Sequence, residues 1–292
     1  GQCAAVCPTA AITIKSNVRE VWEMLNDDNI IVQAQIAPAV RVALGDEFDM
    51  PKGTNVMGNI VAAMRKMGFD EVYDTSTGAD LTVMEESAEL LERLKTGENL
   101  PLLTSCCPAW FKYVETFHPD LKDNVSSCKS PMEMFGAVLK ERAAQEGKNA
   151  GPKTKQTKVI AVMPCTAKKY EVRREEFNYD DKPAVDVSIT TQELAAMIRE
   201  AGLRFDELLP EAVDMPYGIA SGAGVIFGVT GGVTEAVIRA VAGTDRTAVE
   251  QIAFTGVRGF DGVKEVQIPY GDRELSIAIV SGLRNAENLL NA

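Results

Sequence analysis

The segment IIVQAQIAPAV, residues 30–40, decides the fold of this chain. Its first seven residues are β-branched and half-alternating, which predicts a strand that ends before Pro38, because proline donates no hydrogen bond to a neighbouring strand. The stretch GTNVMGNIVAAMRKM at 53–67 predicts a helix, and FDEVYD at 69–74 predicts the next strand. This succession of strand, helix and strand indicates an α/β architecture with a largely parallel sheet.

Apolar periodicity and short apolar runs predict the other elements. The predicted helices cover 16–28, 79–95, a segment from 131, 191–201, and segments from about 234 and 283. The predicted strands follow the first cysteines within 1–14 and cover 100–103, 159–163, 184–189, 253–259, 263–269 and 275–280. The expected helix caps are Ser16 or Asn17, Asp80, and Thr190 or Thr191 with Glu193 close behind. The polar, basic stretch 145–158 is expected to be the boundary between two lobes.

Composition limits the possible functions. At 292 residues the chain exceeds a typical domain, so we expect one large domain or two closely packed lobes. The net charge of −12 argues against binding to nucleic acid or to an anionic membrane. Apolar runs stay below the roughly 18 residues of a membrane span. Six cysteines are too sparse for a disulfide scaffold, and free thiols together with the acidic composition favour a reducing, cytoplasmic setting.

Two cysteine-containing stretches carry the chemistry. They are TSCCPAW at 104–110 and MPCTAKKYE at 163–171, and each follows an apolar run. Thiolates on distant loops, in a chain with one histidine, favour an iron–sulfur centre over zinc or copper. The glycine-rich run 221–233 lacks the spacing of a nucleotide-binding loop. Cys128 is expected to be a packing cysteine, and His118 to lie at the surface or at a helix end.

Together these two stretches resemble the first two signature motifs of the iron-only ([FeFe]) hydrogenases, enzymes that interconvert protons and dihydrogen. The resemblance covers nearly the whole chain. It implies two lobes of twisted, largely parallel sheets flanked by helices, with the active site between the lobes. The family's third motif supplies two further cluster cysteines and is absent up to residue 292. The resemblance therefore implies a fragment that is inactive and unable to retain the cofactor by itself.

The implied cofactor is the H-cluster, a [4Fe–4S] cubane joined through one cysteine to a two-iron unit with CO, cyanide and a dithiolate bridge. By position, Cys107 and Cys165 match cubane ligands. The resemblance also implies that Lys168 donates a hydrogen bond to a cyanide and that Met163 packs against the cofactor.

Three further residues receive roles through the same resemblance. Pro38 and Ala39 match positions that approach a diatomic ligand, although many relatives carry serine where this chain has Ala39. Glu171, three residues after Lys168, is interpreted either as its salt-bridge partner or as a group near the proton entrance.

A proton path is the next implication. Glu86, Glu89 and Arg93 fall on one face of the helix predicted at 79–95, which in an arbitrary helix indicates a solvated salt-bridge stripe. In the family, acids and an arginine at these offsets form a relay from solvent to the cofactor. The resemblance adds Ser126 to that relay and makes Cys106 its last member, a free thiol that exchanges protons with the cofactor.

The N-terminal cysteines suggest a second kind of cluster. Cys3 and Cys7 match the last two cysteines of the ferredoxin pattern C-x2-C-x2-C-x3-C-P. Residues 1–15 are thus expected to be the remnant of a ferredoxin-like 2[4Fe–4S] domain, 16–29 a connecting helix, and 30–292 the catalytic domain, truncated at its C-terminus. Accessory [4Fe–4S] clusters are expected in the full-length parent.

The implied reaction is the reversible reduction of protons to dihydrogen. Its electrons are expected from ferredoxin or from NAD-linked electron-transfer subunits, and its cofactor from H-cluster maturation proteins. Three alternatives remain: a non-catalytic relative in iron–sulfur assembly, a sensory relative, and a binding module without metal. The presence of Cys106 together with Glu86, Glu89 and Arg93 favours the enzyme over the first two, and the cysteine loops with Lys168 disfavour the third.

Overall fold

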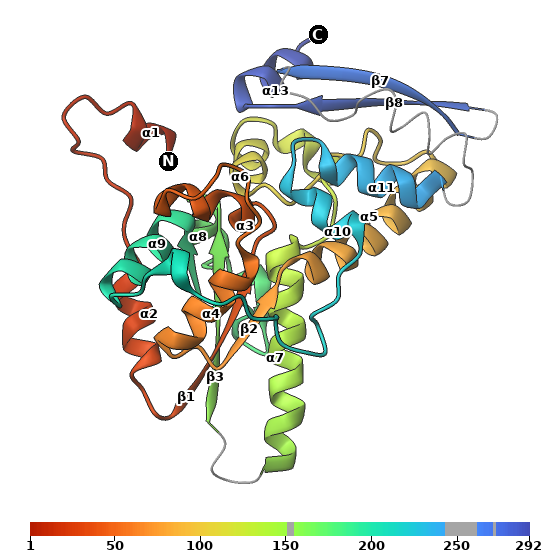
Figure 1. Cartoon of the computed structure of the whole chain (residues 1–292). Coiled ribbons are helices and arrows are strands. Elements are labelled where there is room, and N and C mark those ends of the chain that lie inside the picture. The colour runs from red at the N-terminus through yellow and green to blue at the C-terminus, as the bar shows by residue number, and fades with distance from the viewer. Residues whose placement is uncertain (151–154, 243–261, 271–272) are drawn as a thin grey trace. The chain divides into compact units, whose positions relative to one another are not determined.

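The computed structural model describes residues 1–150, 155–242, 262–270 and 273–292 (Figure 1). The chain divides into two compact units, Gly1–Gly78 with Pro131–Ala220, and Ala79–Ser130 with Ser221–Ala292. The boundary that the sequence placed at 145–158 is wrong, because those residues belong to the first unit. There helix α7 (Pro131–Ala150) continues well into the polar stretch, and strand β3 begins at Gln156.

The first unit is built on a four-stranded parallel sheet in the order β2-β1-β3-β6. The strands are β1 (Ile30–Ile36), β2 (Glu71–Asp74), β3 (Gln156–Met163) and β6 (Val187–Thr190). The central pair β1–β3 is in register from Ile30 opposite Gln156 to Ile36 opposite Val162. The predicted α/β class and parallel sheet are therefore confirmed.

Side-chain alternation along β1 explains the layers on the two faces of this sheet. Gln35 donates through Nε2 to the carbonyl of Met132 on α7 at 2.9 Å, so α7 covers the face of the odd-numbered positions. Val32, Ala34 and Ile36 point to the opposite face and are fully buried or nearly so. Helices α2 (Val18–Leu25), α4 (Met57–Met67) and α9 (Thr191–Glu200) pack together on that side (Figure 1).

The remaining elements of the first unit are short. The α-helices are α1 (Gln2–Ala5), α3 (Val40–Ala43) and α8 (Lys168–Glu171), and a small antiparallel pair joins β4 (Asn178–Tyr179) to β5 (Lys182–Pro183). Short 3₁₀ segments cover Leu44–Phe48, Glu175–Phe177 and Phe205–Glu207.

The second unit is mainly helical in the part of the chain that is described. It contains most of α5 (Ser76–Thr96) and the helices α6 (Pro108–Phe117), α10 (Gly222–Val225), α11 (Gly232–Ala242) and α13 (Leu283–Leu290), with 3₁₀ segments at Pro119–Asn124 and Ile226–Gly228. Strands β7 (Val263–Tyr270) and β8 (Arg273–Val280) form an antiparallel pair, which confirms two predicted strands. The strand predicted at 253–259 lies outside the described residues.

Parallel pairing in the second unit is limited, among the described residues, to one bridge between Leu103 and Val125. The strand predicted at 100–103 is reduced to this bridge. Two backbone hydrogen bonds accompany this bridge. Ser126 N donates to Leu103 O at 2.7 Å, and Leu103 N donates to Asn124 O at 2.9 Å. These bonds hold the chain before the double cysteine beside the segment that carries Ser126.

Two local predictions are wrong. No strand follows the first cysteines within the described part of 1–14; α1 occupies Gln2–Ala5, and Ile12 and Ile14 are 53% and 45% exposed with no strand to cover them. Asp80 does not cap α5, because the helix begins at Ser76, whose N–H donates to Asp74 Oδ1 at 2.8 Å. Asp80 instead accepts from Ser221 N at 2.7 Å and from its hydroxyl at 2.5 Å.

Two helix starts follow the sequence more closely. Thr190 and Glu193 form a reciprocal capping box at the start of α9, as predicted. Asn17 is the N-cap residue of α2, but its side-chain amide donates to Ser188 O at 3.1 Å instead of capping the helix. Among the described residues, no helix combines the length and the apolarity needed to cross a membrane.

The start of α5 packs closely on the start of α7 within the first unit. A Cβ atom at Gly78 would lie 2.3 Å from the carbonyl oxygen of Pro131 and 2.8 Å from Phe135 Cβ. Gly78→Ala is therefore expected to lower the free energy of unfolding by about 1–3 kcal/mol, measured by denaturant titration. Gly222→Ala is the matched control, because a Cβ there meets nothing within 4 Å. Equal stability of the two variants would contradict this packing.

Candidate functional site

One group of candidate residues lies at the carboxyl edge of the parallel sheet in the first unit. From β1 the chain goes on to β2 on one side, and from β3 it goes on to β6 on the other. The order of the strands therefore reverses between β1 and β3, which is where open parallel sheets bind ligands. Ala37 N donates to Val162 O at 3.0 Å, so the residues that follow these two strands begin side by side.

The residues after β1 and β3 are those that the resemblance singled out. Pro38 and Ala39 are half-buried, and Ala39 is the N-cap of the short helix α3. Met163 ends β3 and is 3% exposed, whereas Cys165 is half-buried two residues later. Pro38, Met163 and Cys165 therefore lie at the same edge of the sheet.

Lys168 lies on α8, directly beyond Cys165. Its Nζ donates to Glu171 Oε2 at 2.5 Å, and the two side chains are 13% and 3% exposed. Of the two interpretations left open for Glu171, the structure supports the salt-bridge partner.

A second group of candidate residues belongs to the second unit. Cys107 is the N-cap of α6 in an extended conformation, and Pro108 occupies the first helical position, where its missing N–H is not needed. The N-terminus of a ten-residue helix favours an anionic group such as a ligating thiolate. Cys107 is exposed and Cys106 is half-buried.

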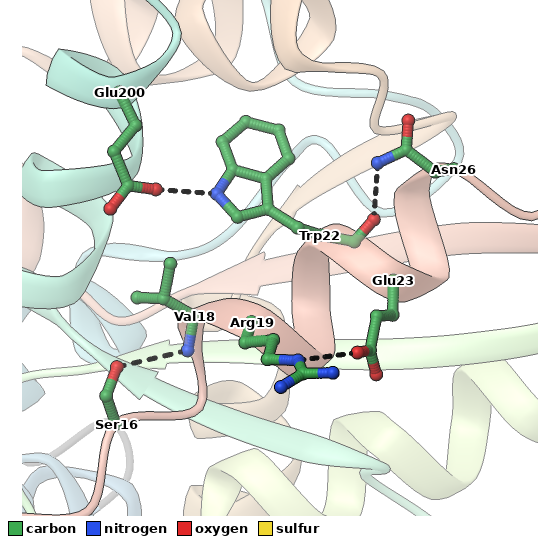
Figure 2. A pocket seen from close by; sticks show the side chains of 7 residues that line it. All are labelled: Ser16, Val18, Arg19, Trp22, Glu23, Asn26 and Glu200. Atoms are coloured by element: carbon green, nitrogen blue, oxygen red, sulfur yellow. Dashed lines mark hydrogen bonds and ion pairs between the residues drawn. The ribbon is translucent and has the colours of Figure 1, made fainter.

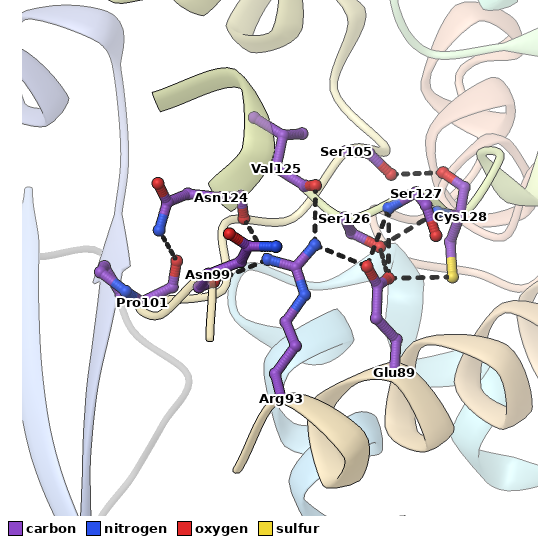
Figure 3. A network of polar contacts seen from close by, with 10 residues as sticks. All are labelled: Glu89, Arg93, Asn99, Pro101, Ser105, Asn124, Val125, Ser126, Ser127 and Cys128. Atoms are coloured by element: carbon purple, nitrogen blue, oxygen red, sulfur yellow. Dashed lines mark hydrogen bonds and ion pairs between the residues drawn. The ribbon is translucent and has the colours of Figure 1, made fainter. Parts of the chain in front are cut away.

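Glu89 is the centre of a polar network in this unit (Figure 3). Its carboxylate accepts from Arg93 Nη2 at 2.6 Å, from the Ser126 hydroxyl at 2.6 Å, and from Ser127 N at 3.1 and 3.2 Å. The side chains of Glu89 and Arg93 are 16% and 12% exposed, so this is not the solvated stripe of an ordinary surface helix. Arg93 is fixed in turn by the carbonyls of Asn99, Asn124 and Val125.

The two acids of α5 experience opposite environments. Burial by itself would raise the pKa of Glu89, but hydrogen bonds from Ser126, Ser127 and Arg93 hold it below its ordinary value. Burial and the nearby charge of Glu89 raise the pKa of Glu86 to about 7. Glu86 is 2% exposed, and its Oε1 has no hydrogen-bond partner among the described residues. One carboxyl therefore stays ionised while the other gains and loses a proton near neutral pH.

Sequence reasoning missed the contacts that hold this network. Ser105 Oγ donates to Cys128 O at 2.5 Å, and Ser127 supplies its backbone N–H to Glu89. Neither role has a sequence signature, because the partners are 23 and 38 residues apart. Cys128 itself is a half-buried thiol whose Sγ lies 3.7 Å from Glu89 Oε2, and burial raises its pKa to about 11.

The remaining sequence candidates lie elsewhere. Cys3 and Cys7 belong to the first unit, and hydrogen bonds from the Ile12 N–H and the Thr9 hydroxyl lower the pKa of Cys7 to about 7. His118 is at the end of α6, as predicted, with Nε2 2.7 Å from Glu287 Oε2.

An open pocket beside α2 contains none of the predicted site residues (Figure 2). It is lined by Ser16, Val18, Arg19, Trp22, Glu23, Asn26 and Glu200. Within it, Trp22 Nε1 donates to Glu200 Oε2 at 2.7 Å.

An iron–sulfur cofactor can be tested against this donor set. Cys107 and Cys165 are free thiols that are not fully buried. Cys107 lies at the start of α6, and Cys165 follows the end of β3. Lys168 places a nearly buried ammonium three residues after Cys165. Thiolates and a cation suit an anionic cluster. The two cysteines belong to different units, and among the described residues no group of three His, Cys, Asp or Glu side chains gathers to hold a metal. The residues are of the kind that binds such a cluster.

Comparison with known proteins identifies the class. Residues 30–292 match the sequence model of the family described as "Iron only hydrogenase large subunit, C-terminal domain". The chain belongs to this family, as the two cysteine motifs indicated.

The relatives and solved structures agree with that assignment. The chain is 45% identical over 298 aligned residues to the NADP-reducing hydrogenase subunit HndD of Solidesulfovibrio fructosivorans, covering 99% of this chain and 50% of that protein. It is 42% identical to the periplasmic [Fe] hydrogenase large subunit of Nitratidesulfovibrio vulgaris, covering 92% and 64%. A variant [FeFe]-hydrogenase structure from Chlamydomonas reinhardtii matches with a TM-score of 0.76 and 33% identity, covering 95% and 78%.

The curated relatives also include a protein of another kind. A cytosolic Fe-S cluster assembly factor of Xenopus tropicalis is 27% identical, covering 99% of this chain and 63% of that protein. The chain spans about half the length of the Solidesulfovibrio relative and under two thirds of the length of the other two curated relatives.

The raised pKa of Glu86 predicts a pH dependence of stability. The folded protein keeps this proton at a pH where the unfolded chain has released it, so the free energy of unfolding falls as pH rises from about 4.5 to about 7 and stays reduced above that. Glu86→Gln removes this penalty. Relative to the unsubstituted protein it is expected to gain up to about 3 kcal/mol between pH 4 and pH 8, measured by denaturant unfolding.

The control for this prediction is Glu92→Gln on the same helix, because the Glu92 side chain is 66% exposed. Its profile should run parallel to that of the unsubstituted protein. Parallel profiles for both variants would mean that Glu86 titrates normally.

Proposed function

We propose that this chain is the catalytic portion of an iron-only hydrogenase that interconverts protons and dihydrogen. The observation that carries the proposal is the Arg93–Glu89–Ser126 network with Glu86 one turn earlier on α5. Two nearly buried acids with separated pKa values, one of them held by hydrogen bonds, suit proton transfer and have no evident use in a purely structural protein. Membership of the hydrogenase family supports the same conclusion.

Cys107 and Cys165 are proposed to hold the cubane of the H-cluster, together with thiolates from outside these residues. When bound, the H-cluster would supply the metal centre at which electrons from the donor reduce protons. Lys168 would place a positive charge beside its anionic ligands, and Met163, Pro38 and Ala39 would form its apolar surroundings. Because Cys107 and Cys165 are an incomplete ligand set, the 292 residues expressed alone are expected to evolve no hydrogen.

The chain's own residues are proposed to move the proton. Arg93 keeps Glu89 anionic at the outer end, and the Ser126 hydroxyl, already donating to Glu89 Oε2, can pass a proton on as it rotates. Glu86, with its pKa of about 7, holds the next proton without a large energetic step in either direction. Cys106 Sγ is the proposed final donor and acceptor.

Electrons are proposed to arrive from ferredoxin or from an NAD(P)-linked subunit. The name of the Solidesulfovibrio relative, an NADP-reducing hydrogenase subunit, favours the second source. Accessory [4Fe–4S] clusters, one of them involving Cys3 or Cys7, would deliver the electrons, and dedicated maturation proteins would install the H-cluster. We propose a cytoplasmic location, because six cysteines are too sparse for a disulfide scaffold and the composition is acidic. The periplasmic relative is the alternative that cell fractionation would reveal.

A role in iron–sulfur assembly is the second candidate, because an assembly factor aligns with almost the whole chain. That role needs a cluster but no proton relay. The nearly buried Glu89–Arg93 pair and the buried Glu86 favour the enzyme.

The test is hydrogen evolution from reduced methyl viologen by the protein expressed from its complete reading frame and matured without oxygen. Cys106→Ala is expected to lower the rate at least about 100-fold at unchanged iron content, because it removes the final proton donor. Cys128→Ala is the control and should stay within a few-fold of the unsubstituted rate. No hydrogen from a fully iron-loaded protein would reject the enzyme and leave the assembly role.

A further inference from the structure

A nearly buried ion pair behind the Cys165 segment has no part in the function proposed above. Lys169 Nζ donates to Glu193 Oε1 at 2.6 Å, and the two side chains are 10% and 13% exposed. Lys169 lies on α8, four residues after Cys165, whereas Glu193 lies in the first turn of α9. All of these residues belong to the first unit.

This pair joins three separate segments of chain. Glu193 Oε1 also accepts from Asn17 N at 2.8 Å, and Glu193 Oε2 accepts from Thr190 N at 2.7 Å. Lys169 Nζ donates a second bond, to the carbonyl of Lys15 at 2.8 Å. The connector before α2, the helix after Cys165 and the start of α9 therefore share one carboxylate and one ammonium.

The charges of this pair are matched. Burial by itself would raise the pKa of Glu193, but the hydrogen bonds from Lys169, Thr190 and Asn17 and the charge of Lys169 hold it below its ordinary value. Glu193 is thus ionised at neutral pH, opposite the ammonium of Lys169. Removing either partner leaves the other as an uncompensated charge in a nearly dry place.

Helix α8 needs such an anchor. It has four residues, far fewer than an isolated helix needs to be stable in water. Its first residue, Lys168, is paired within the same helix, with Glu171, and that bond does not attach α8 to another element. Lys169 supplies such an attachment, because both of its bonds reach other segments of the chain.

We propose that Glu193 is a positioning residue for the Cys165 segment. Through Lys169 it fixes α8, and with it Cys165 and Lys168, and it fastens the connector from the Cys3–Cys7 segment to the same helix. This inference rests on the proposed function in one respect, the assignment of Cys165 as a cluster ligand. It also assigns the pair an electrostatic role, since it keeps the field of the Lys169 ammonium neutralised near that ligand.

The sign of the electrostatic effect can be worked out for each variant. Glu193→Gln leaves the ammonium uncompensated, which favours the extra electron of a reduced cluster and shifts its potential to more positive values. Lys169→Met leaves the carboxylate uncompensated and shifts the potential to more negative values. The double variant removes both charges and should return close to the unsubstituted potential.

The experiment is an EPR-monitored redox titration of the protein from its complete reading frame, carrying the cubane without the two-iron unit. Glu47→Gln is the matched control, because Glu47 pairs with Arg199, which is 52% exposed. Opposite shifts for the two single variants, cancelled in the double variant, would support the proposal. Unchanged potentials would overturn the proposal. Shifts of the same sign in both single variants, which a general loosening of the fold would give, would also overturn it.

A second measurement does not depend on the cluster. Amide hydrogen exchange at Asn17 should become faster in Glu193→Gln, while amides of the central strand β3 keep their protection. Unchanged exchange at Asn17 would overturn the fastening role. A protein that evolves no hydrogen yet gives both results would reject the proposed enzyme while supporting this inference, so the two can fail separately.

Discussion

The parallel pairing of β1 with β3 is the constraint on which the first unit depends. These strands are buried on both faces, because Ala34 on one face and Gln35 on the other are both 0% exposed. A slip of one residue would therefore move the glutamine side chains of β1 into the apolar layer and the apolar side chains out of it. Burial of apolar surface, which contributes about 25 cal/mol per Å², is the main interaction that stabilises this pair of strands. Because the chain leaves the two strands toward opposite sides of the sheet, the segments that begin at Pro38 and Cys165 must start at one edge.

In the second unit, hydrogen bonds between polar groups position the candidate residues. A single parallel bridge and two backbone hydrogen bonds place the Ser126 segment beside the chain that leads into the double cysteine. Glu89 accepts hydrogen bonds from three residues and stays charged. Burial together with that charge raises the pKa of Glu86 to about 7. The proposed relay thus depends on a difference in pKa between two chemically identical side chains, which is created by their surroundings.

The sequence predicted the parts of this structure that local pattern controls. Strand β1 agrees to the residue, Gly68 ends α4, and Thr190 with Glu193 caps α9, because periodicity and capping are properties of neighbouring residues. Asp80 failed as a cap because Asp74 binds the Ser76 amide first. Ser105, Ser127 and Lys169 could not be singled out from the sequence, because their partners are 23 to 38 residues away. The ligand and relay roles came from motif resemblance, since spacing by itself does not distinguish a relay from a surface salt bridge.

Cys107 and Cys165 are proposed to be ligands of one cluster. Diffraction at the iron absorption edge, from crystals of the cluster-loaded protein, tests this proposal most directly. The account predicts one compact group of iron atoms bonded to the Sγ atoms of both cysteines. Iron bonded to only one of them, or to Cys128 in place of either, would contradict it.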